Sequence, residues 1–397
     1  MKKYITILPL IFLLFFLTFY IYNSKFEVIF DEEFNKQNIV YNNDIIINYY
    51  DNILLTDIIS LNEGDISKIK LDTDFIGNKV IDFYYSIGND VYKASANYTV
   101  VDTEAPLILN SPSYSVLNGN SINFLNTIFV ADNYDTQIDC SIDGDYDFNV
   151  TGTYNLSIGC MDTSGNFIRN YFNLYVKDEI ETYNYTSSDI YFDDLLDNYI
   201  DENSSAGIDV SHWQGDIDWD KVKAAGAEFV IIRIGYAPSD DGDFFLDKKF
   251  EENIKGAKEA GLDVGLYYFS YARSIEQVVE HANFIVDKLD GMELELPISF
   301  DWEIWSKFKE YELNLATLNQ MALAFIETVE EAGYEGMNYS SAYYLRNIWD
   351  IDVPTWLAHY TTQTNYEGDY FMWQLADTGK IDGISGYVDL NILYKNK

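Results

Sequence analysis

Strand-like and helix-like segments alternate from Gly207 onward, and this alternation constrains the fold more than any other feature of the chain. Eight short apolar segments predict strands: Gly207–Ser211, Phe229–Gly235, Val264–Ser270, Pro297–Glu303, Gly336–Ser340, Thr355–Tyr360, Met372–Leu375 and Val388–Leu390. Helical periodicity falls between the early ones: Trp219–Ala225, Phe250–Ala260, Ile275–Leu289 and Leu315–Ala332. The last three strands are joined by loops too short for full helices. We therefore predict an α/β fold, a β/α barrel whose final third lacks helices, over residues 206–397.

Residues 26–178 have no convincing helical period and read as short alternating strands broken by Asn, Asp and Gly. An internal repeat is present, because Asp74–Gly77 and Val150–Gly152 each precede a similar pattern, in which Val80–Tyr85 corresponds to Tyr154–Ile158. Two units of roughly 75 residues with frequent turn signals predict paired all-β sandwiches. We place their boundaries at residues 26–103 and 104–178.

Residues 179–205 contain eight acidic residues and no Lys or Arg, which predicts a self-repelling acidic linker, in which Asp193–Ile200 could form a helical turn. Cys140 and Cys160 are the two cysteines of the chain. A disulfide between them and a pair of buried free thiols both fit the sequence. The acids of Asp143–Asp147 are better explained as solvated turn residues than as a calcium loop, so no metal is expected.

The N-terminus begins with Met1, Lys2 and Lys3 and continues with an uncharged run from Tyr4 to Tyr22. Nineteen residues suffice to span a bilayer as a helix, and no small-residue cleavage pattern follows them. We predict a signal anchor and transmembrane helix over residues 1–25, with the remainder of the chain outside the cell at the membrane. Secretion to the cell wall is the alternative.

The composition excludes one class of partner. A formal charge of −40 over 397 residues opposes nucleic-acid binding, which needs clustered Lys and Arg. Any polyanionic target must be held by shape and hydrogen bonds. A monomer is expected.

Asp301-Trp302-Glu303 closes an apolar strand, and strand alternation places the two carboxylates on one face, about 7 Å apart. Acid-catalysed cleavage of a glycosidic bond uses such a pair, one protonated and one negative beside a developing cation. The same spacing occurs in Asp31–Glu33 and Asp102–Glu104, which we interpret as solvated loop residues.

Functional groups of a β/α barrel collect at the carboxyl ends of its strands. Four acids fall there and should converge on one mouth: Asp209, Asp301, Glu303 and Asp389. Other polar strand-end residues are Arg233, Tyr268, Tyr339, His359, Tyr360 and Gln374. An aromatic lining suited to stacking on sugar rings is expected from Trp213, Tyr268, Tyr271, Trp302, Tyr339, Trp356, Tyr360 and Trp373. Trp219 and Trp349 are assigned to core packing.

The barrel region resembles the Chalaropsis-type lysozymes, glycoside hydrolase family 25. The resemblance rests on Gly207–Gly215, Phe229–Arg233, Asp301–Glu303, Trp356–Tyr360, Trp373–Gln374 and Gly383–Asn391. It implies a flattened (β/α)5(β)3 barrel and N-acetylmuramidase activity on the β-1,4 bond from N-acetylmuramic acid to N-acetylglucosamine in peptidoglycan glycan strands. Val101–Pro106 and Asp162–Asn166 similarly resemble parts of bacterial immunoglobulin-like surface modules, which are usually spacers or adhesive stalks.

The family resemblance also implies roles for single residues. Glu303 matches the general acid, Asp301 the acid that orients the N-acetyl group or stabilises the cation, and Asp209 and Asp389 the remaining acids at the rim. Tyr339 matches a tyrosine near the N-acetyl group. Arg233, Tyr268, Trp356, Tyr360, Trp373 and Gln374 complete the expected substrate-binding set. Tyr268 stands where many members have His, and Arg233 where Lys is also found.

The acetamido group of the substrate can replace a protein nucleophile. No metal or cofactor is expected. Neighbouring carboxylates would raise the pKa of Glu303 by like-charge repulsion. Two alternatives belong to other functional classes: a wall-binding surface protein that has lost turnover, and an adhesin that binds through its sandwiches. Binding without cleavage would favour the first. Loss of attachment on deleting residues 26–178 would favour the second.

Overall fold

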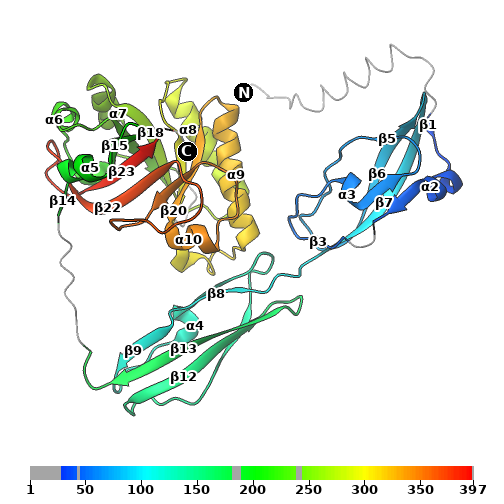
Figure 1. Ribbon diagram of the computed structural model, residues 1–397, viewed down its shortest axis with the longest axis horizontal. Coiled ribbons are helices and arrows are strands. Elements are labelled where there is room, and N and C mark those ends of the chain that lie inside the picture. Colours follow the sequence, from blue (N-terminus) through cyan, green and yellow to red (C-terminus); the bar gives the residue numbers. More distant parts are fainter. Residues whose placement is uncertain (1–27, 43–44, 181–188, 238–243, 396–397) are drawn as a thin grey trace. The chain divides into compact units, whose positions relative to one another are not determined.

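The computed structural model describes residues 28–42, 45–180, 189–237 and 244–395 (Figure 1). The chain divides into two compact units, residues 1–104 and residues 105–397. No helix in the described part of the chain is long and apolar enough to cross a membrane. The anchor predicted for residues 1–25 lies outside the described residues.

The first unit is built on a long antiparallel hairpin of β6 (Gly77–Ile87) and β7 (Asp90–Val101). The two strands form a five-stranded sheet with β1 (Val28–Ile29), β3 (Ile47–Asn48) and β5 (Asp65–Ile66). A second ladder pairs β2 (Ile39–Tyr41) with β4 (Ile59–Leu61). Two short helices, α2 (Glu32–Asn38) and α3 (Leu55–Ile58), complete the unit.

The first unit corrects two interpretations of acidic residues. Asp31 is the N-cap of α2 and accepts a hydrogen bond from the Phe34 amide at 3.0 Å, and Glu32 and Glu33 form the first helical turn. These acids therefore suit the positive end of a helix rather than a loop. Asp102 is buried, with 6% of its surface exposed, and is not a solvated loop residue.

The second unit opens with an all-β region whose core lies between two sheets. One sheet has the order β11-β12-β13-β9, formed by β11 (Asp139–Asp143), β12 (Gly152–Met161), β13 (Phe167–Lys177) and β9 (Ser113–Leu117). The other pairs β8 (Leu107–Leu109) with β10 (Phe129–Ala131), and a short helix, α4 (Phe124–Thr127), lies between. The hairpins β6–β7 and β12–β13 are the two copies of the sequence repeat. The immunoglobulin-like identity of both regions stays a prediction.

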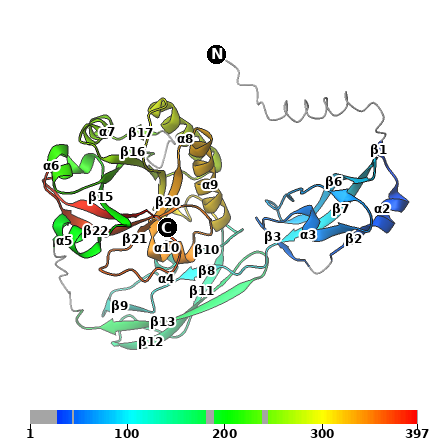
Figure 2. The ribbon, with the colours of Figure 1, turned by 45° about the horizontal axis from the view of Figure 1, so that its top comes forward.

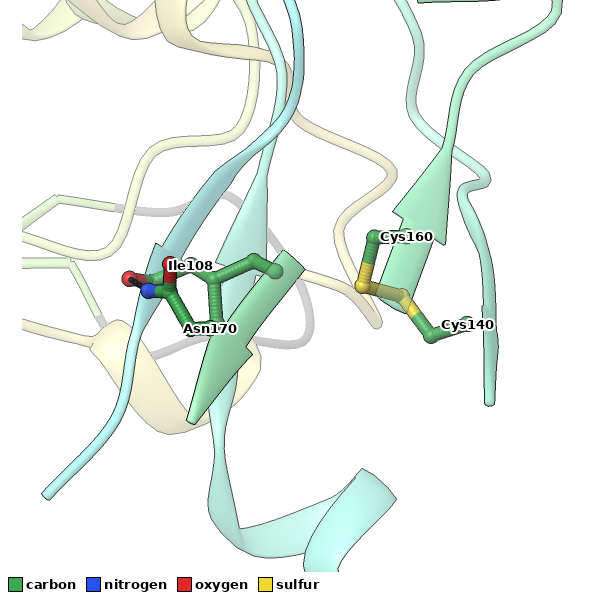
Figure 3. Close-up of a disulfide and its surroundings, with 4 residues drawn as sticks. All are labelled: Ile108, Cys140, Cys160 and Asn170. Carbon is green, nitrogen blue, oxygen red and sulfur yellow. Dashed lines mark hydrogen bonds between the residues drawn. A yellow bond between two sulfur atoms is a disulfide. The ribbon is translucent and has the colours of Figure 1, made fainter. Parts of the chain in front are cut away.

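A disulfide joins Cys140 and Cys160, which lie directly opposite each other on β11 and β12 (Figure 3). Nearby, the Asn170 side-chain amide donates to the Ile108 carbonyl at 3.1 Å and ties β13 to β8. The disulfide decides between the two alternatives that the sequence left open, and the alternative of two buried free thiols is wrong.

Replacing both cysteines by alanine should lower the free energy of unfolding of the second unit by about 3 kcal/mol, because the bridge closes a 20-residue loop. Chemical unfolding with and without reductant measures this. Reductant should destabilise the wild type and leave the double variant unchanged. An identical midpoint for reduced and oxidised wild type would contradict the prediction.

The rest of the second unit is a closed barrel of eight strands (Figure 2). The strands are β15 (Ser204–Val210), β16 (Phe229–Tyr236), β18 (Asp263–Ser270), β19 (Ile298–Trp302), β20 (Gly336–Ser341), β21 (Thr355–Ala358), β22 (Met372–Lys380) and β23 (Val388–Tyr394). Neighbours are parallel from β15 to β22, whereas β23 is antiparallel to both β22 and β15 and closes the ring. The eight predicted strands are thus confirmed.

Helices surround the early strands: α6 (Trp219–Ala224), α7 (Phe250–Glu259), α8 (Ile275–Leu289) and α9 (Leu315–Glu331) (Figure 2). They agree with the four predicted helices. The sequence did not predict the shorter α10 (Ala342–Asn347), the 3₁₀ turns η1 (His212–Gln214) and η2 (Trp305–Lys307), or the two-residue strand β17 (Phe245–Leu246). Gly261 ends α7 with φ +75°, a conformation that favours glycine over residues with a side chain.

The predicted linker is too long at its carboxyl end. β14 (Ile190–Tyr191) pairs with β22, and α5 (Phe192–Tyr199) buries Phe192 and Leu195 in the core around the barrel. These apolar residues outweigh the acidic composition of the segment. Residues 190–205 therefore belong to the barrel region.

The β region of residues 105–178 shares a hydrophobic core with the barrel. Phe129 of β10 contacts Trp305 and Phe308, with ring centroids 6.0 and 5.2 Å apart. The backbone amide of Leu315 donates to the Asp132 carbonyl at 2.7 Å. This region braces the loop that follows β19, so it is not a free spacer.

Candidate active site

Alternation along the strands separates two kinds of side chain. One set points into the barrel and forms a small interior cluster that includes Phe229, Ile231, Met337, Trp356 and Met372. The other set faces the helices and belongs to a larger outer core. Residues at the carboxyl ends of the strands that share the inward parity lie above the interior cluster and form the floor of the candidate site.

Asp209 and Asp389 are paired across β15 and β23 and share a hydrogen bond between their carboxyl groups. Burial and the adjacent Asp209 charge raise the pKa of Asp389 to about 9. Burial also raises the pKa of Asp209, but amide donors oppose this shift. Near neutral pH Asp389 therefore holds a proton, which it donates to Asp209 in the hydrogen bond between the two carboxyl groups.

Two side-chain amides hold the Asp209 carboxylate. Gln374 Nε2 and Asn391 Nδ2 donate to its Oδ2 at 2.9 and 2.8 Å. The Gln374 carbonyl oxygen in turn accepts from the Tyr339 and Tyr360 hydroxyls at 2.9 and 3.0 Å. Each of these amide and hydroxyl groups has a defined donor or acceptor role, so the network fixes the orientation of Asp209.

Asp301 lies at the end of β19 and is buried, with 4% of its surface exposed. Burial raises its pKa well above the usual value, and the charges of Glu303 and Asp209 add to the shift, while Arg233 lowers it. Its Oδ1 has no hydrogen-bond partner among the described residues. A buried carboxyl oxygen without a partner is costly, and a bound ligand that donates a hydrogen bond would satisfy it.

Glu303 follows Asp301 on the same face and reaches solvent at the mouth of a pocket of about 320 Å³. The pocket is lined by Glu303, Tyr339, Ser341, Ala342, Tyr343, Arg346, Ala358, His359 and Tyr360. Partial burial raises the pKa of Glu303 to about 6, and the Asp209 charge contributes. Glu303 can therefore carry a proton in mildly acidic solution and still touch a ligand.

Arg233 supplies positive charge near the acids, since its guanidinium lowers the pKa of Asp301. Asp247 binds it, with Oδ2 lying 2.8 Å from Nε and 2.6 Å from Nη2. The same carboxylate accepts from the His212 backbone amide at 3.2 Å. Asp247 and Asn391 are site residues that the sequence analysis missed.

Three predicted aromatic residues do not line the site. Tyr268 is fully buried among the helices, where its hydroxyl meets His281 and its ring stacks on Phe325. Its neighbour Tyr267 points inward instead. Burial is the main cause that raises the pKa of Tyr267, and the charges of Asp209, Asp301 and Asp389 raise it further. The assignment of Tyr268 to substrate binding is thus wrong.

Trp373 and Trp302 also face outward. Trp373 donates from Nε1 to the His359 carbonyl, and Trp302 donates from Nε1 to the Ala272 carbonyl, both at 2.9 Å. Both rings belong to the outer core. The predicted sugar contacts of these two tryptophans are therefore corrected to structural roles, whereas Trp219 and Trp349 pack in the core as predicted.

The remaining predicted residues lie in or beneath the site. Trp356 is 1% exposed and donates from Nε1 to Asn391 Oδ1 at 2.9 Å, so it supports the floor from below. Tyr271 is half-buried near Asp301. Trp213 and Tyr360 are exposed at the rim, with 77% and 53% of their surfaces accessible. The four acids predicted to converge do so.

Comparison with known proteins finds related sequences for the barrel region. The family model for "Glycosyl hydrolases family 25" matches residues 208–384. The uncharacterised protein YegX of Escherichia coli K12 is 29% identical over 193 residues, covering 47% of this chain and 68% of YegX. The autolytic lysozyme of Clostridium acetobutylicum is 26% identical over 189 residues, covering 47% of this chain and 54% of that protein.

Among solved structures, a family 25 glycosyl hydrolase from Bacillus anthracis aligns with 50% of this chain and 93% of its own, at 25% identity and a TM-score of 0.43. The chain spans about half the length of the clostridial lysozyme it matches. The match to the family model covers slightly less than half of the chain and includes Asp209, Asp301 and Glu303 of the site. The chain is accordingly an enzyme of the glycoside hydrolase class.

Proposed function

We propose that the protein is a peptidoglycan N-acetylmuramidase that hydrolyses the β-1,4 bond between N-acetylmuramic acid and N-acetylglucosamine. The observation that carries the proposal is Glu303, whose pKa of about 6 suits a proton donor, beside the buried acids Asp301 and Asp209. The matched family and the name of the clostridial autolytic lysozyme support the same substrate.

In the proposed mechanism Glu303 protonates the glycosidic oxygen as the bond to the anomeric carbon breaks. The carbonyl oxygen of the substrate's own acetamido group attacks that carbon and forms a cyclic oxazolinium ion, which removes the need for a protein nucleophile. Asp301 Oδ1, which lacks a partner among the described residues, accepts from the acetamido N–H. Water then opens the ring from the face the leaving group vacated, and the Glu303 carboxylate takes its proton.

Arg233 and the Asp209–Asp389 pair set the charge of the site. The Asp209 carboxylate stabilises positive charge that develops on the sugar ring. Asp389 is protonated and therefore adds no further negative charge to the site. Tyr339 and Tyr360, fixed by Gln374, border the pocket where the N-acetyl group would lie. These roles need neither a metal nor a cofactor.

Peptidoglycan digestion tests the proposal directly. Purified wall is incubated with the enzyme, the new ends are reduced with borohydride, and the fragments are analysed by mass. A muramidase produces reduced muramic acid ends. Reduced glucosamine ends would instead indicate a glucosaminidase, and intact strands with bound protein would favour a wall-binding protein without turnover.

We also propose that the enzyme acts outside the cell. The apolar run from Tyr4 to Tyr22, which lies outside the described residues, would anchor it to the membrane as a single-pass protein, and secretion to the wall is the alternative. The β-rich residues 28–178 would carry the barrel toward the wall. The immunoglobulin-like resemblance supports this arrangement.

The pH profile should report the Glu303 proton. Glu303 acts as an acid only when protonated, so kcat/KM should fall about tenfold per pH unit above its pKa of about 6. In Asp209→Asn the charge that helps to raise this pKa is gone, while burial still raises it. The alkaline limb should therefore shift to lower pH.

Initial rates on peptidoglycan measured between about pH 4 and about pH 9 check this shift. Asp377→Asn is a matched control, because Asp377 raises the pKa of Asp389 and does not contribute to that of Glu303. The control should leave the alkaline limb in place. An alkaline limb of the pH profile that is unchanged, or shifted to higher pH, in Asp209→Asn would contradict the electrostatic argument.

A further inference from the structure

An exposed tryptophan stands at the rim of the barrel, directly after β15. Trp213 has 77% of its surface accessible, the largest fraction among the exposed large apolar side chains of the described residues. A tryptophan normally buries most of its ring, so exposure of this extent costs apolar contact with the protein. The exposure therefore needs a reason other than stability.

The backbone around Trp213 is held in one conformation. It lies in η1, where the Ser211 hydroxyl accepts from the Trp213 backbone amide at 3.2 Å and the side-chain Oε1 of Gln214 accepts from the Ser211 backbone amide at 2.8 Å. Gln214 Nε2 also donates to the Tyr387 carbonyl at 3.3 Å, which ties the turn to the residue that precedes β23. The ring is thus presented by a rigid turn.

The face of the ring that meets the protein rests on a histidine. The centroids of His212 and Trp213 lie 4.4 Å apart with an angle of 32° between the planes. His212 is itself fixed by the fully buried Asp247 carboxylate, 3.1 Å from Nδ1, and by the Arg233 guanidinium. A buried charged network therefore supports one face of the indole and leaves the other open.

The position of Trp213 defines what could reach it. Around the barrel the strands follow the order β15-β16-β18-β19-β20-β21-β22-β23, so the end of β20 is opposite the end of β15. The pocket beside Glu303 is lined from β19, β20 and β21. Asp209 and Asp389 are paired at the ends of the adjacent strands β15 and β23, on the Trp213 side of the barrel mouth, and the Asp209 charge acts on Glu303 at the pocket. An extended ligand that binds in the pocket and continues past Asp209 and Asp389 would therefore contact the open face of the Trp213 indole.

We propose that Trp213 is the stacking platform of a distal subsite that binds one N-acetylated pyranose ring of a glycan strand, remote from the bond that is cleaved. The apolar face of such a ring matches the open indole face in size, and this stacking requires no charged group on the ligand. A polyanionic occupant is disfavoured, because the chain carries a formal charge of −40. The inference rests on the proposed function and adds that the enzyme binds long glycan strands more tightly than short ones.

The test compares two substrates, glycan strands freed of their peptide cross-links and a tetrasaccharide of the same sugars. Trp213→Ala should raise KM on the long strands roughly three- to tenfold with little change in kcat, because a distal contact is equal in ground state and transition state. The ratio of kcat/KM on long strands to that on the tetrasaccharide should fall by the same factor. Trp213→Tyr should restore most of it.

Tyr171→Ala is the matched control, since Tyr171 is an aromatic of similar exposure, 75%, on β13. It should leave both KM values unchanged. If Trp213→Ala behaves like this control, or lowers kcat equally on both substrates, the distal subsite is overturned. In that outcome the open indole face would be left to a protein partner.

A binding measurement separates this inference from the proposed activity. In the Glu303→Gln background, without turnover, Trp213→Ala should weaken binding to long strands by the same three- to tenfold factor, read by sedimentation with insoluble wall. Loss of wall cleavage in the wild type with this binding difference intact would remove the muramidase proposal and keep the subsite. Equal binding by both proteins would remove the subsite alone.

Discussion

Glu303→Gln should lower kcat for the release of muramic acid ends by about 10²- to 10⁴-fold, the usual contribution of a general acid. Glutamine keeps the shape of the side chain and its place at the end of β19 but has no acidic proton to give to the leaving oxygen. KM should change little, because glutamine can still contact the sugar. Reducing ends measured on purified peptidoglycan give the rate.

The substitution should not unfold the barrel. Glu303 is accessible to solvent, and its removal relieves repulsion with Asp209 and Asp301, so the free energy of unfolding should stay the same or rise. Glu310→Gln is a suitable control, since Glu310 is an exposed carboxylate whose ion pair with Lys307 at 2.6 Å lies just beyond the site. The control should keep full activity. Activity of Glu303→Gln within tenfold of wild type would move the proton donor to another carboxyl group, with Asp301 the first to test.

Much of the barrel could be predicted because its signals are local. Each strand is a short apolar run, and each early helix repeats apolar residues at helical spacing, so the element order follows from the sequence. The short helix α10 was missed because six residues carry too little periodicity. The helical turn expected at Asp193–Ile200 corresponds to α5, but residues 190–205 were assigned to the linker because their acids outnumber Phe192 and Leu195, the two residues that bury the segment.

The candidate site was predicted less completely, and the errors concern which way a side chain points. Trp302 lies between Asp301 and Glu303, which share a face, so strand alternation alone places it on the opposite face. Trp373 precedes the inward Gln374 and faces outward for the same reason. Applying the alternation to these aromatics would have removed them from the predicted lining.

Tyr268 required information that the sequence does not contain. It follows Tyr267 on β18, and either tyrosine could have pointed inward. The choice depends on the register with β16, where Arg233 pairs with Tyr267 and an irregularity separates Arg233 from Gly235. Asp247 was missed for a different reason, since it follows the two-residue β17 and has no motif around it.

Asp247→Ala should strongly destabilise the barrel, with an expected loss of about 3–5 kcal/mol in the free energy of unfolding. Its carboxylate is fully buried against the Arg233 guanidinium, and removing it leaves that cation in the interior without this partner. Burial alone would raise the pKa of Asp247, but hydrogen bonds from the Lys249 amide and from Arg233 outweigh it and hold the pKa below its usual value. The carboxylate is therefore ionised in the folded state.

Chemical denaturation of the two alanine variants Asp247→Ala and Asp216→Ala separates a buried ion pair from a surface one. Asp216 is exposed and pairs with Lys249 at 2.5 Å, and its removal should change the stability little because solvent screens the pair. Because the folded pKa of Asp247 is depressed, its contribution is present above the unfolded pKa of an aspartate and is lost as the pH falls through the folded value. The gap between the two variants should hence narrow in acid.

A double variant identifies the cause of the loss. Combining Asp247→Leu with Arg233→Met removes both charges and replaces them with apolar groups of similar size, which should recover most of the stability lost in Asp247→Ala. The double variant should still be a poor enzyme, since Arg233 no longer lowers the pKa of Asp301 and His212 loses its anchor. Equal instability of the single and double variants would mean that Asp247 acts through the amides of Lys249 and His212. In that case the backbone around α7 and η1, and not the charge of Arg233, is what the carboxylate holds in place.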